Sequence, residues 1–182
     1  MTSLLSEEKQ WVIECLVRET RGLPGALAEL GVYKGGNALR MAQAGMGKKI
    51  YLFDTFEGIP EKGPFDVHNV GDFSDVSLEE IRKMFEGFQA DFRVGKFPET
   101  TKGIEAAFTV VHIDADQYEA TKAGLDYFWP RLVYGGYIVL DDYAWPQCPG
   151  VMRAVDAFKN TETGFDYGIA AACQLWIKKV DP

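Results

Sequence analysis

The chain has 182 residues, 47% of them hydrophobic and 25% charged, a composition that suits a globular protein with a single core. The formal net charge of −8 argues against a nucleic-acid partner, because phosphate contacts need lysine and arginine. No apolar run approaches the ~20 residues that span a membrane, and the N-terminus is too acidic for a signal peptide, so we expect a cytoplasmic protein without a membrane partner.

Segments with helical and strand-like patterns alternate along the chain. Apolar residues at helical spacing, among them Leu4, Trp11 and Cys15, predict a helix over 4–21. In chain order we then expect a strand at 26–33, a helix at 35–46, a strand at 49–56, a long loop at 57–76, a helix at 77–88, strands at 91–97 and 108–116, a segment at 118–132 that is helical up to Pro130, a strand at 135–143, a helix at 150–160, and strands at 165–171 and 173–179. This alternation predicts an α/β fold in which helices cover both faces of a parallel sheet.

In such sheets, ligands bind where the strands end. The first strand runs into "ELGVYKGG", whose glycines either let the backbone approach a ligand or simply form the turn. The second strand ends at Asp54, which lies 25 residues after Glu29. An acid at this place suits hydrogen bonds to ribose hydroxyls, although Asp54 with Thr55 also fits a strand-end cap.

Four aspartates follow two later strands. Asp114 and Asp116 follow one strand, and Asp141 and Asp142 follow the next, so adjacent strands would crowd these carboxylates together. A hard divalent ion such as Mg²⁺, Ca²⁺ or Mn²⁺ would relieve the repulsion. Asp116 equally suits a cap for the helix that follows it. The triplet 114–116 also matches the DxD metal motif of glycosyltransferases.

Other single residues with reactive side chains give weaker indications of function than the aspartates do. His112 lies inside an apolar strand and is expected to pack in the core, whereas His68, in the long loop, is a candidate general base. Tyr118 and Lys122 have the YxxxK spacing of short-chain dehydrogenases, but the other motifs of those enzymes are missing, and Lys122 fits a solvated helix face. The cysteines (Cys15, Cys148 and Cys173) show neither zinc nor disulfide spacing and are expected to be reduced, packed thiols.

Several stretches together resemble a known family. They are "ELGVYKGG", "LFDTFEGIP", "HNVGDFSDVSLEEIRKMF", "HIDADQYEATKAGLDYFWPRLVYGGYIVLDDY" and "QLWIKK", in order over residues 26–178. They resemble class I S-adenosylmethionine methyltransferases, and more narrowly the macrocin and mycinamicin sugar O-methyltransferases. The resemblance implies a single domain over 1–182, with an N-terminal helix in 1–25 and a core of 26–182. It implies a Rossmann-like, seven-stranded, mostly parallel sheet with an antiparallel last strand.

The resemblance also implies an activity, which is Mg²⁺-dependent methyl transfer from S-adenosylmethionine to a hydroxyl of a vicinal diol, such as that of a sugar. The implied cofactor-binding residues are Glu29, Gly31, Val32, Tyr33, Asp54, Thr55 and Ser77, and Ser77 also fits a helix cap in a capping box with Glu80. Asp114, Asp141 and Asp142 match the family's Mg²⁺ ligands, and His68 matches its proposed catalytic base.

The chain departs from related enzymes at some positions. Gln117 occupies the place of a lysine that metal-dependent catechol methyltransferases carry, and the segment before the first strand is shorter than in the macrolide enzymes. A DxD glycosyltransferase and a non-catalytic S-adenosylmethionine-binding protein are the alternatives. The expected partner is a small hydroxylated molecule. The aromatic content of 13%, with Trp129 and Trp145, would also permit a homo-oligomer.

Overall fold

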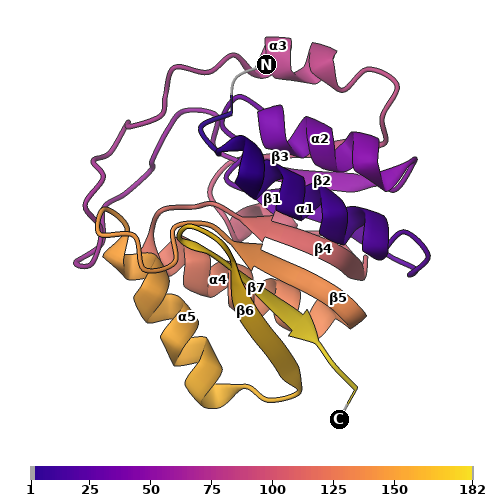
Figure 1. Ribbon diagram of the computed structural model, residues 1–182. Coiled ribbons are helices and arrows are strands. Elements are labelled where there is room, and N and C mark those ends of the chain that lie inside the picture. Colours follow the sequence, from indigo (N-terminus) through magenta and orange to yellow (C-terminus); the bar gives the residue numbers. More distant parts are fainter. Residues whose placement is uncertain (1–2, 182) are drawn as a thin grey trace.

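A computed structural model describes residues 3–181 and shows a seven-stranded sheet with helices on both sides (Figure 1). The strands are β1 (Ala26–Leu30), β2 (Ile50–Asp54), β3 (Ala90–Val94), β4 (Phe108–Ile113), β5 (Leu132–Leu140), β6 (Phe165–Ala171) and β7 (Gln174–Lys179). The α-helices are α1 (Glu7–Glu19), α2 (Gly36–Gly45), α3 (Leu78–Met84), α4 (Tyr118–Phe128) and α5 (Pro149–Thr161).

The strand order is β3-β2-β1-β4-β5-β7-β6, and β7 runs antiparallel to both of its neighbours. The strands β1 to β5 pair in parallel. This topology confirms the predicted class I methyltransferase-like sheet with its antiparallel last strand. The chain reverses its direction of travel across the sheet after β3, so that β1 and β4 are neighbours at the centre, where such sheets bind their ligands.

Two separate apolar clusters pack the helices onto the sheet. One lies under α1, α2 and α3 and includes Ile13, Met41 and Ile81; the other lies under α4 and α5 and includes Phe128 and Val155. The first helix group lies above the sheet in Figure 1 and the second below it. Alternate strand residues point to opposite faces, so β1, β2, β4 and β5 each contribute side chains to both clusters.

The first helix differs from its prediction in both its start and its buried face. It begins at Glu7, because the Ser6 hydroxyl accepts a hydrogen bond from the backbone N–H of Lys9. Its buried residues are Gln10, Ile13 and Val17, whereas Trp11 is 60% exposed. Burial of a polar glutamine is possible here because its amide donates to the Leu5 carbonyl, 2.8 Å away.

Several strands and helices are shorter than predicted. The strand β1 stops at Leu30 because Gly31 turns with φ +87°, and a Cβ at Gly31 would lie 1.9 Å from the Asp114 carbonyl oxygen. Only glycine therefore fits this contact between the ends of β1 and β4. The helix α4 stops at Phe128, and a 3-10 turn containing Pro130 leads into β5, which begins three residues before the predicted start.

The loop 57–76 contains no helix or strand, as predicted, but Asp66 fixes it to the core. Asp66 is 8% exposed. One of its oxygens accepts from the first backbone N–H of α4, at Tyr118 (2.9 Å), and the other accepts from Gly63 (2.8 Å). This carboxylate caps the positive end of α4 and holds the loop that carries His68.

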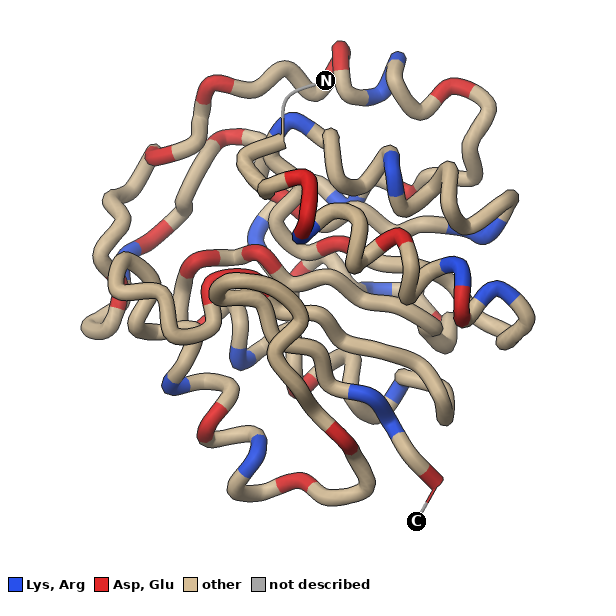
Figure 2. The backbone as a smooth tube through the Cα atoms, in the orientation of Figure 1, with Lys and Arg blue, Asp and Glu red and all other residues tan. Residues whose placement is uncertain are grey.

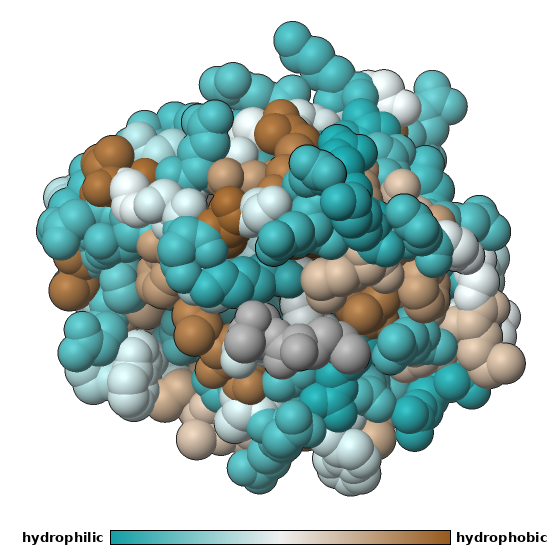
Figure 3. All heavy atoms as spheres, turned by 90° about the horizontal axis from the view of Figure 1, so that it is seen from above, coloured by the Kyte–Doolittle hydropathy of each residue, from teal (hydrophilic) through white to brown (hydrophobic). Residues whose placement is uncertain are grey.

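The face of the molecule seen from above in Figure 3 is mostly hydrophilic. Figure 2 shows acidic residues gathered where β4 and β5 end, and Figure 3 shows hydrophobic side chains in separate groups among hydrophilic ones on the face seen from above. Within residues 3–181, no helix is long and apolar enough to cross a membrane. Trp129 is buried against Phe158 and Phe165, so Trp145 is the more exposed of the two tryptophans named for an interface. A homo-oligomer stays a prediction.

Candidate functional site

A cavity of about 1130 Å³ opens at the carboxyl ends of the strands. We call it the strand-end cavity. Its walls come from the turns after β1, β2, β3, β4 and β5, from the long loop, and from the N-terminal segment 3–6. The predicted site residues that line it are Glu29, Gly31, Val32, Tyr33, Asp54, Thr55, His68, Asp114, Asp141 and Asp142.

Strand register explains why these residues meet. Leu30 pairs with Phe53 on one side and with Ile113 on the other, and Ile113 pairs with Leu140. The residue that follows each of these four is a predicted site residue, so Gly31, Asp54, Asp114 and Asp141 form one row along the edge of the sheet. The spacing of the sequence motifs predicts that the strand ends at Asp114 and Asp141 are neighbours, and the pairing of β4 with β5 agrees with this.

Asp54 organises the turn after β1. Its Oδ2 accepts from the backbone N–H groups of Val32 (2.7 Å) and Tyr33 (2.8 Å), and its Oδ1 accepts from Phe56 N–H (2.7 Å). Thr55 donates its hydroxyl to the Gly58 carbonyl at 2.6 Å. Asp54 is thus a strand-end cap. A carboxylate offers about four acceptor positions, and backbone N–H groups occupy three of those of Asp54.

Glu29 lies beneath this turn in a buried polar network. Its Oε1 accepts from Asn37 Nδ2 (2.6 Å) and lies 2.8 Å from His112 Nδ1, and all three side chains are buried. His112 is a core histidine, as predicted, but the glutamate that partners it was not foreseen. Glu29 Oε2 has no hydrogen-bond partner among the described residues. A buried, unpaired oxygen at the cavity wall suits a ligand donor.

Ser77 is the one predicted cofactor residue outside the lining of the strand-end cavity. It is exposed, and its hydroxyl accepts from Glu80 N–H (3.3 Å) at the start of α3. The helix-cap role is therefore confirmed, and the cofactor contact stays a prediction.

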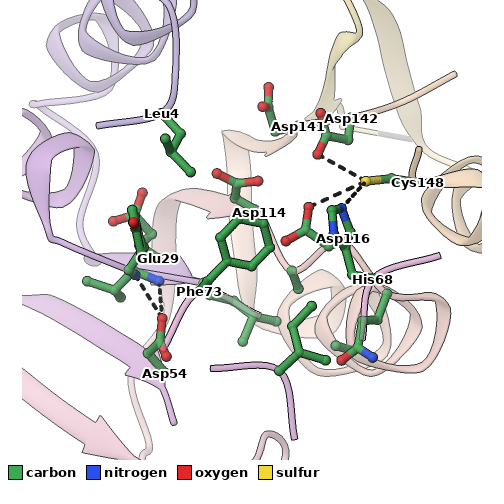
Figure 4. A pocket seen from close by; sticks show the side chains of 18 of the residues that line it. Leu4, Glu29, Asp54, His68, Phe73, Asp114, Asp116, Asp141, Asp142 and Cys148 are labelled. Atoms are coloured by element: carbon green, nitrogen blue, oxygen red, sulfur yellow. Dashed lines mark hydrogen bonds between the residues drawn. The ribbon is translucent and has the colours of Figure 1, made fainter. Parts of the chain in front are cut away.

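Three carboxylates face one another on the other side of the cavity. Asp114, Asp116 and Asp142 each bring an oxygen within 4.8 Å of the others (Figure 4). Asp116 and Asp142 both have φ of +58°. Left-handed backbone is uncommon for residues other than glycine and is tolerated best by aspartate and asparagine. The two strand-end turns thus share a geometry that aims their carboxylates into one place.

The negative charges of these carboxylates are only weakly balanced by positive charges nearby. Burial, together with the charges of Asp141, Asp116 and Asp142, raises the pKa of Asp114 well above its usual range. Burial and the neighbouring Asp142 raise the pKa of Asp116 to about 8. Like charges held this close favour protonation or a bound cation.

Asp141 points to a different partner. Its Oδ2 lies 2.9 Å from the Lys9 ammonium of α1, with only 6% of the Asp141 side chain and 15% of the Lys9 side chain exposed. Burial raises the pKa of Asp141, although His112 and Lys9 oppose the rise. Burial lowers the pKa of Lys9, but the hydrogen bond and the charges of the aspartates outweigh it, and the net pKa is raised. Asp141 Oδ1 has no hydrogen-bond partner among the described residues.

The donor set therefore fits a hard divalent ion. All of its donors are carboxylate oxygens, the ligands that Mg²⁺ prefers, and their repulsion is not neutralised within the cluster. The structure brings Asp116 into the group with Asp114 and Asp142, which the sequence left open. It places Asp141 beside this group, paired with Lys9, so that the metal role of Asp141 stays a prediction.

His68 lies across the cavity from Glu29 and next to the acidic group (Figure 4). Its Nε2 is 3.7 Å from the Cys148 sulfur, and its Nδ1 is 3.6 Å from Asp72 Oδ2. The Cys148 thiol lies 3.4 Å from both Asp116 Oδ1 and Asp142 Oδ2. Cys148 is a buried free thiol, as predicted. Burial and the two aspartates raise its pKa.

The dehydrogenase-like pair has no part in this site. Lys122 is exposed on α4 and forms an ion pair with Asp126 at 2.5 Å. Neither Tyr118 nor Lys122 lines the strand-end cavity. The solvated-face interpretation of Lys122 is confirmed.

The model of the macrocin O-methyltransferase (TylF) family matches residues 8–170, which is most of the chain. The chain belongs to this family. Membership agrees with the resemblance seen in the sequence and gives the glycosyltransferase alternative no support. The row of strand-end residues, with its acidic group, is therefore the candidate active site of a TylF-family protein.

Relatives and solved structures agree with this placement. One relative is an 8-demethyl-8-(2,3-dimethoxy-alpha-L-rhamnosyl)-tetracenomycin-C 4′-O-methyltransferase of Streptomyces olivaceus, 32% identical over 158 residues that cover 76% of this chain and 60% of that protein. Another is the mycinamicin III 3″-O-methyltransferase of Micromonospora griseorubida, 29% identical, with 76% of this chain and 62% of that protein covered.

The structure of the O-methyltransferase NovP superposes with a TM-score of 0.87 at 25% identity and covers 98% of this chain and 82% of that one. The chain spans about three fifths of the length of the curated relatives that it matches.

Proposed function

We propose that this TylF-family chain is an S-adenosylmethionine-dependent O-methyltransferase that uses Mg²⁺ and methylates one hydroxyl of a vicinal diol on a sugar or sugar-containing molecule. The observation that carries the proposal is the single row of strand-end residues, in which Gly31 and Asp54 on one side adjoin the uncompensated Asp114 group on the other. Cofactor, ion and acceptor can then meet in one cavity.

The cofactor would occupy the side formed by the turns after β1 and β2, bordered by Glu29, Val32, Tyr33 and Asp54. S-adenosylmethionine, when bound, supplies the electrophilic methyl group. The chain fixes the turn through the backbone N–H groups that Asp54 accepts, so that this wall is in place before binding. Pre-organised positioning can supply a large part of the rate of a two-substrate reaction.

Asp114, Asp116 and Asp142 would hold the ion, and Asp141 stands beside them for a further contact. A bound Mg²⁺ acts as a Lewis acid that makes a substrate hydroxyl more acidic and orients it. A vicinal diol offers two adjacent oxygens to such an ion, which supports this acceptor class. The three carboxylates contribute negative charge that the ion then neutralises.

His68 would accept the proton of the reacting hydroxyl at its Nε2. The side chain is 24% exposed and lines the cavity next to the acidic group, so that it can reach an acceptor held there. Asp66 anchors the loop that carries it, and Asp72 faces its Nδ1. A carboxylate on that side favours the tautomer whose Nε2 is free to accept a proton.

Two observations support the proposed acceptor class, which are the volume of the cavity and the similarity to relatives. The cavity of about 1130 Å³ is larger than the ~300–1,000 Å³ of ordinary small-molecule sites, which suits a cofactor together with a second substrate. The name of one relative contains a rhamnosyl group. Leu4 and Leu5 of the N-terminal segment line the cavity and give it an apolar wall for the rest of an acceptor.

Calorimetric titration of S-adenosylmethionine into the purified chain, with Mg²⁺ and with EDTA, tests the proposal. We expect micromolar binding in both, and methyl transfer to diol-containing sugars only with Mg²⁺. Full activity in EDTA would contradict the metal requirement. Binding without transfer to any diol would support the non-catalytic alternative, and absence of cofactor binding would overturn the proposed function.

A further inference from the structure

A second group of potential metal ligands adjoins the carboxylates. It consists of His68, Asp116 and Cys148, whose Nε2, carboxylate oxygen and Sγ atoms all lie within 4.8 Å of one another. The group shares Asp116 with the acidic cluster but differs in its chemistry, since it offers one nitrogen, one sulfur and one oxygen. Soft and borderline donors of this kind select Zn²⁺ and similar transition metals over Mg²⁺.

The distances between these side chains suit such an ion. Zinc binds sulfur at ~2.3 Å and nitrogen or oxygen at ~2.0–2.2 Å, so two ligand atoms of a tetrahedral site lie about 3.5 Å apart. Cys148 Sγ lies 3.7 Å from His68 Nε2 and 3.4 Å from Asp116 Oδ1. The sulfur therefore already stands near the separations from the other two ligand atoms that a bound ion requires, and His68 and Asp116 lie within 4.8 Å of each other.

The surroundings of His68 point the same way. Zinc-binding histidines usually have a carboxylate or carbonyl on the ring nitrogen that does not bind the metal. Asp72 Oδ2 lies 3.6 Å from His68 Nδ1, while Nε2 faces the sulfur. Asp72 thus places a carboxylate on the side of the ring away from Cys148, outside the ligand group itself.

Access and charge also permit binding. All three side chains line the strand-end cavity, so an ion can enter from it. A fourth position is left to water or to Asp142, whose Oδ2 lies 3.4 Å from the sulfur. Burial and two aspartates keep Cys148 a thiol in the free protein. A bound dication favours the thiolate over the thiol. The thiol proton then leaves to solvent when the Sγ–metal bond forms.

We propose that His68, Asp116 and Cys148 form a second, thiophilic metal site that binds Zn²⁺ beside the carboxylate site. Occupation of this site withdraws Asp116 from the acidic cluster and blocks the Nε2 atom of His68. Provided that the proposed function holds, Zn²⁺ is then an inhibitor that acts at concentrations far below those of the activating Mg²⁺. The site would make the protein responsive to the supply of thiophilic metals.

Cobalt titration tests the site without cofactor or acceptor, so its result does not depend on the proposed function. Co²⁺ replaces Zn²⁺ and gives a thiolate-to-cobalt absorption band in the near ultraviolet when sulfur is a ligand. The protein to use is the Cys15→Ser/Cys173→Ser variant, which keeps Cys148 as its single cysteine. We expect the band to saturate at one equivalent of Co²⁺ and to be removed by Zn²⁺. Absence of the band would overturn the proposal.

Three further variants locate the ion. Cys148→Ser should lose the band, and a band that persists there would contradict the site. Because Cys148 is buried, circular dichroism should establish that this variant folds. His68→Gln, on a half-exposed loop, should weaken Co²⁺ binding at least about 10-fold, and unchanged affinity would also overturn the proposal. Asp114→Asn changes only the carboxylate site, so the band should remain; its loss would place the ion among the aspartates instead.

The inhibition is measured separately. Zn²⁺ added to the Mg²⁺-supported reaction should inhibit the unmodified chain, and Cys148→Ser should keep a larger share of its own Mg²⁺-supported activity at the same Zn²⁺ concentration. Equal sensitivity of the two proteins would contradict the regulatory role. A cobalt band without methyl transfer would instead leave the metal site standing and remove the proposed function.

Discussion

The two sides of the strand-end cavity treat their carboxylates in opposite ways. At the ends of β1 and β2, Asp54 accepts three backbone N–H groups. We call the ends of β4 and β5 the acidic side; it comprises Asp114, Asp116, Asp141 and Asp142. Carboxylates face one another there, and Lys9 forms an ion pair with only one of them, Asp141. Backbone N–H groups thus stabilise the negative charge of Asp54 on the first side, whereas the carboxylates of the second side need a positive charge that the cluster does not contain.

This difference means that each side can be impaired without the other. Changes on the acidic side should abolish turnover and leave cofactor binding intact. Changes at Asp54 should instead weaken cofactor binding and leave the acidic side intact. The predictions below begin with the largest expected effect.

His68→Gln should lower kcat for methyl transfer by about 10²–10⁴-fold, because general-base catalysis contributes that much. Glutamine keeps a polar side chain of similar reach but cannot take up the proton. Stopped assays with saturating cofactor and Mg²⁺ measure the rate, and calorimetry should give an unchanged cofactor Kd. A variant that retains more than a tenth of the activity would remove His68 from the role of base.

Asp114→Asn should lower the rate of methyl transfer by about 10²–10³-fold, because Lewis-acid stabilisation contributes several kcal/mol and each 1.36 kcal/mol is a tenfold change. Cofactor binding should stay within about threefold. Asp126→Asn is the matched control, because Asp126 is an exposed carboxylate on α4 that lies outside the cavity. If high Mg²⁺ fails to restore any activity to Asp114→Asn while the control is normal, the residue does more than weaken ion binding.

Asp54→Asn should weaken S-adenosylmethionine binding about 10–100-fold, because a hydrogen bond to a charged group contributes about 1.5–3 kcal/mol. The amide nitrogen would also face the N–H of Phe56, which already donates to Oδ1, so the turn should loosen. Equilibrium titration measures the Kd, again with Asp126→Asn beside it. An unchanged Kd would show that the ribose lies elsewhere. Ser77→Ala in the same titration tests whether that exposed cap touches the cofactor.

Lys9→Met should reduce the free energy of unfolding by about 1–3 kcal/mol in EDTA, a value between those of exposed and buried ion pairs, because it leaves Asp141 without its partner. Mg²⁺ should restore part of this loss. The control is Lys122→Met, which breaks an exposed pair and should cost less than about 1 kcal/mol. Equal losses in the two variants, measured by urea unfolding, would mean that Lys9 does not compensate the acidic side.

The last prediction concerns pH. The folded-state pKa values of Asp114 and Asp116 are raised, the second to about 8, so the folded protein holds protons that the unfolded chain has already lost. In EDTA, the free energy of unfolding should therefore fall as the pH rises from about 4 toward 8. Saturating Mg²⁺ should reduce this decline, and Asp116→Asn should flatten it. Urea unfolding at several pH values measures the slope, and the same slope in all three samples would contradict the account.

Much of the site could be predicted because parallel strands align their ends. The alternation of elements and the aspartates after two strands are local patterns, and the register of β1, β4 and β5 turns them into one row. Contacts between side chains that are far apart in the sequence are not marked by any local sequence pattern. Lys9 and Asp141 are separated by 132 positions, and nothing near Lys9 in the sequence marks its partner.

Cys148 could not be placed for a similar reason. A lone cysteine in a loop reads as a packed thiol, and only the tertiary structure sets it beside His68 and Asp116. The buried face of α1 was mispredicted because apolar spacing gave Trp11 more weight than Gln10, whose hydrogen bonds let it enter the interior.

The position of β7 between β5 and β6 has a consequence for synthesis. Until residues 174–179 have left the ribosome, the backbone of β5 lacks its outer partner, and an apolar strand edge stays open beside Asp141. The pairing of β4 with β5, which places Asp114 and Asp141, can therefore form before β5 gains its neighbour on the other side. Pairings between segments so far apart form slowly, because a long loop must close first.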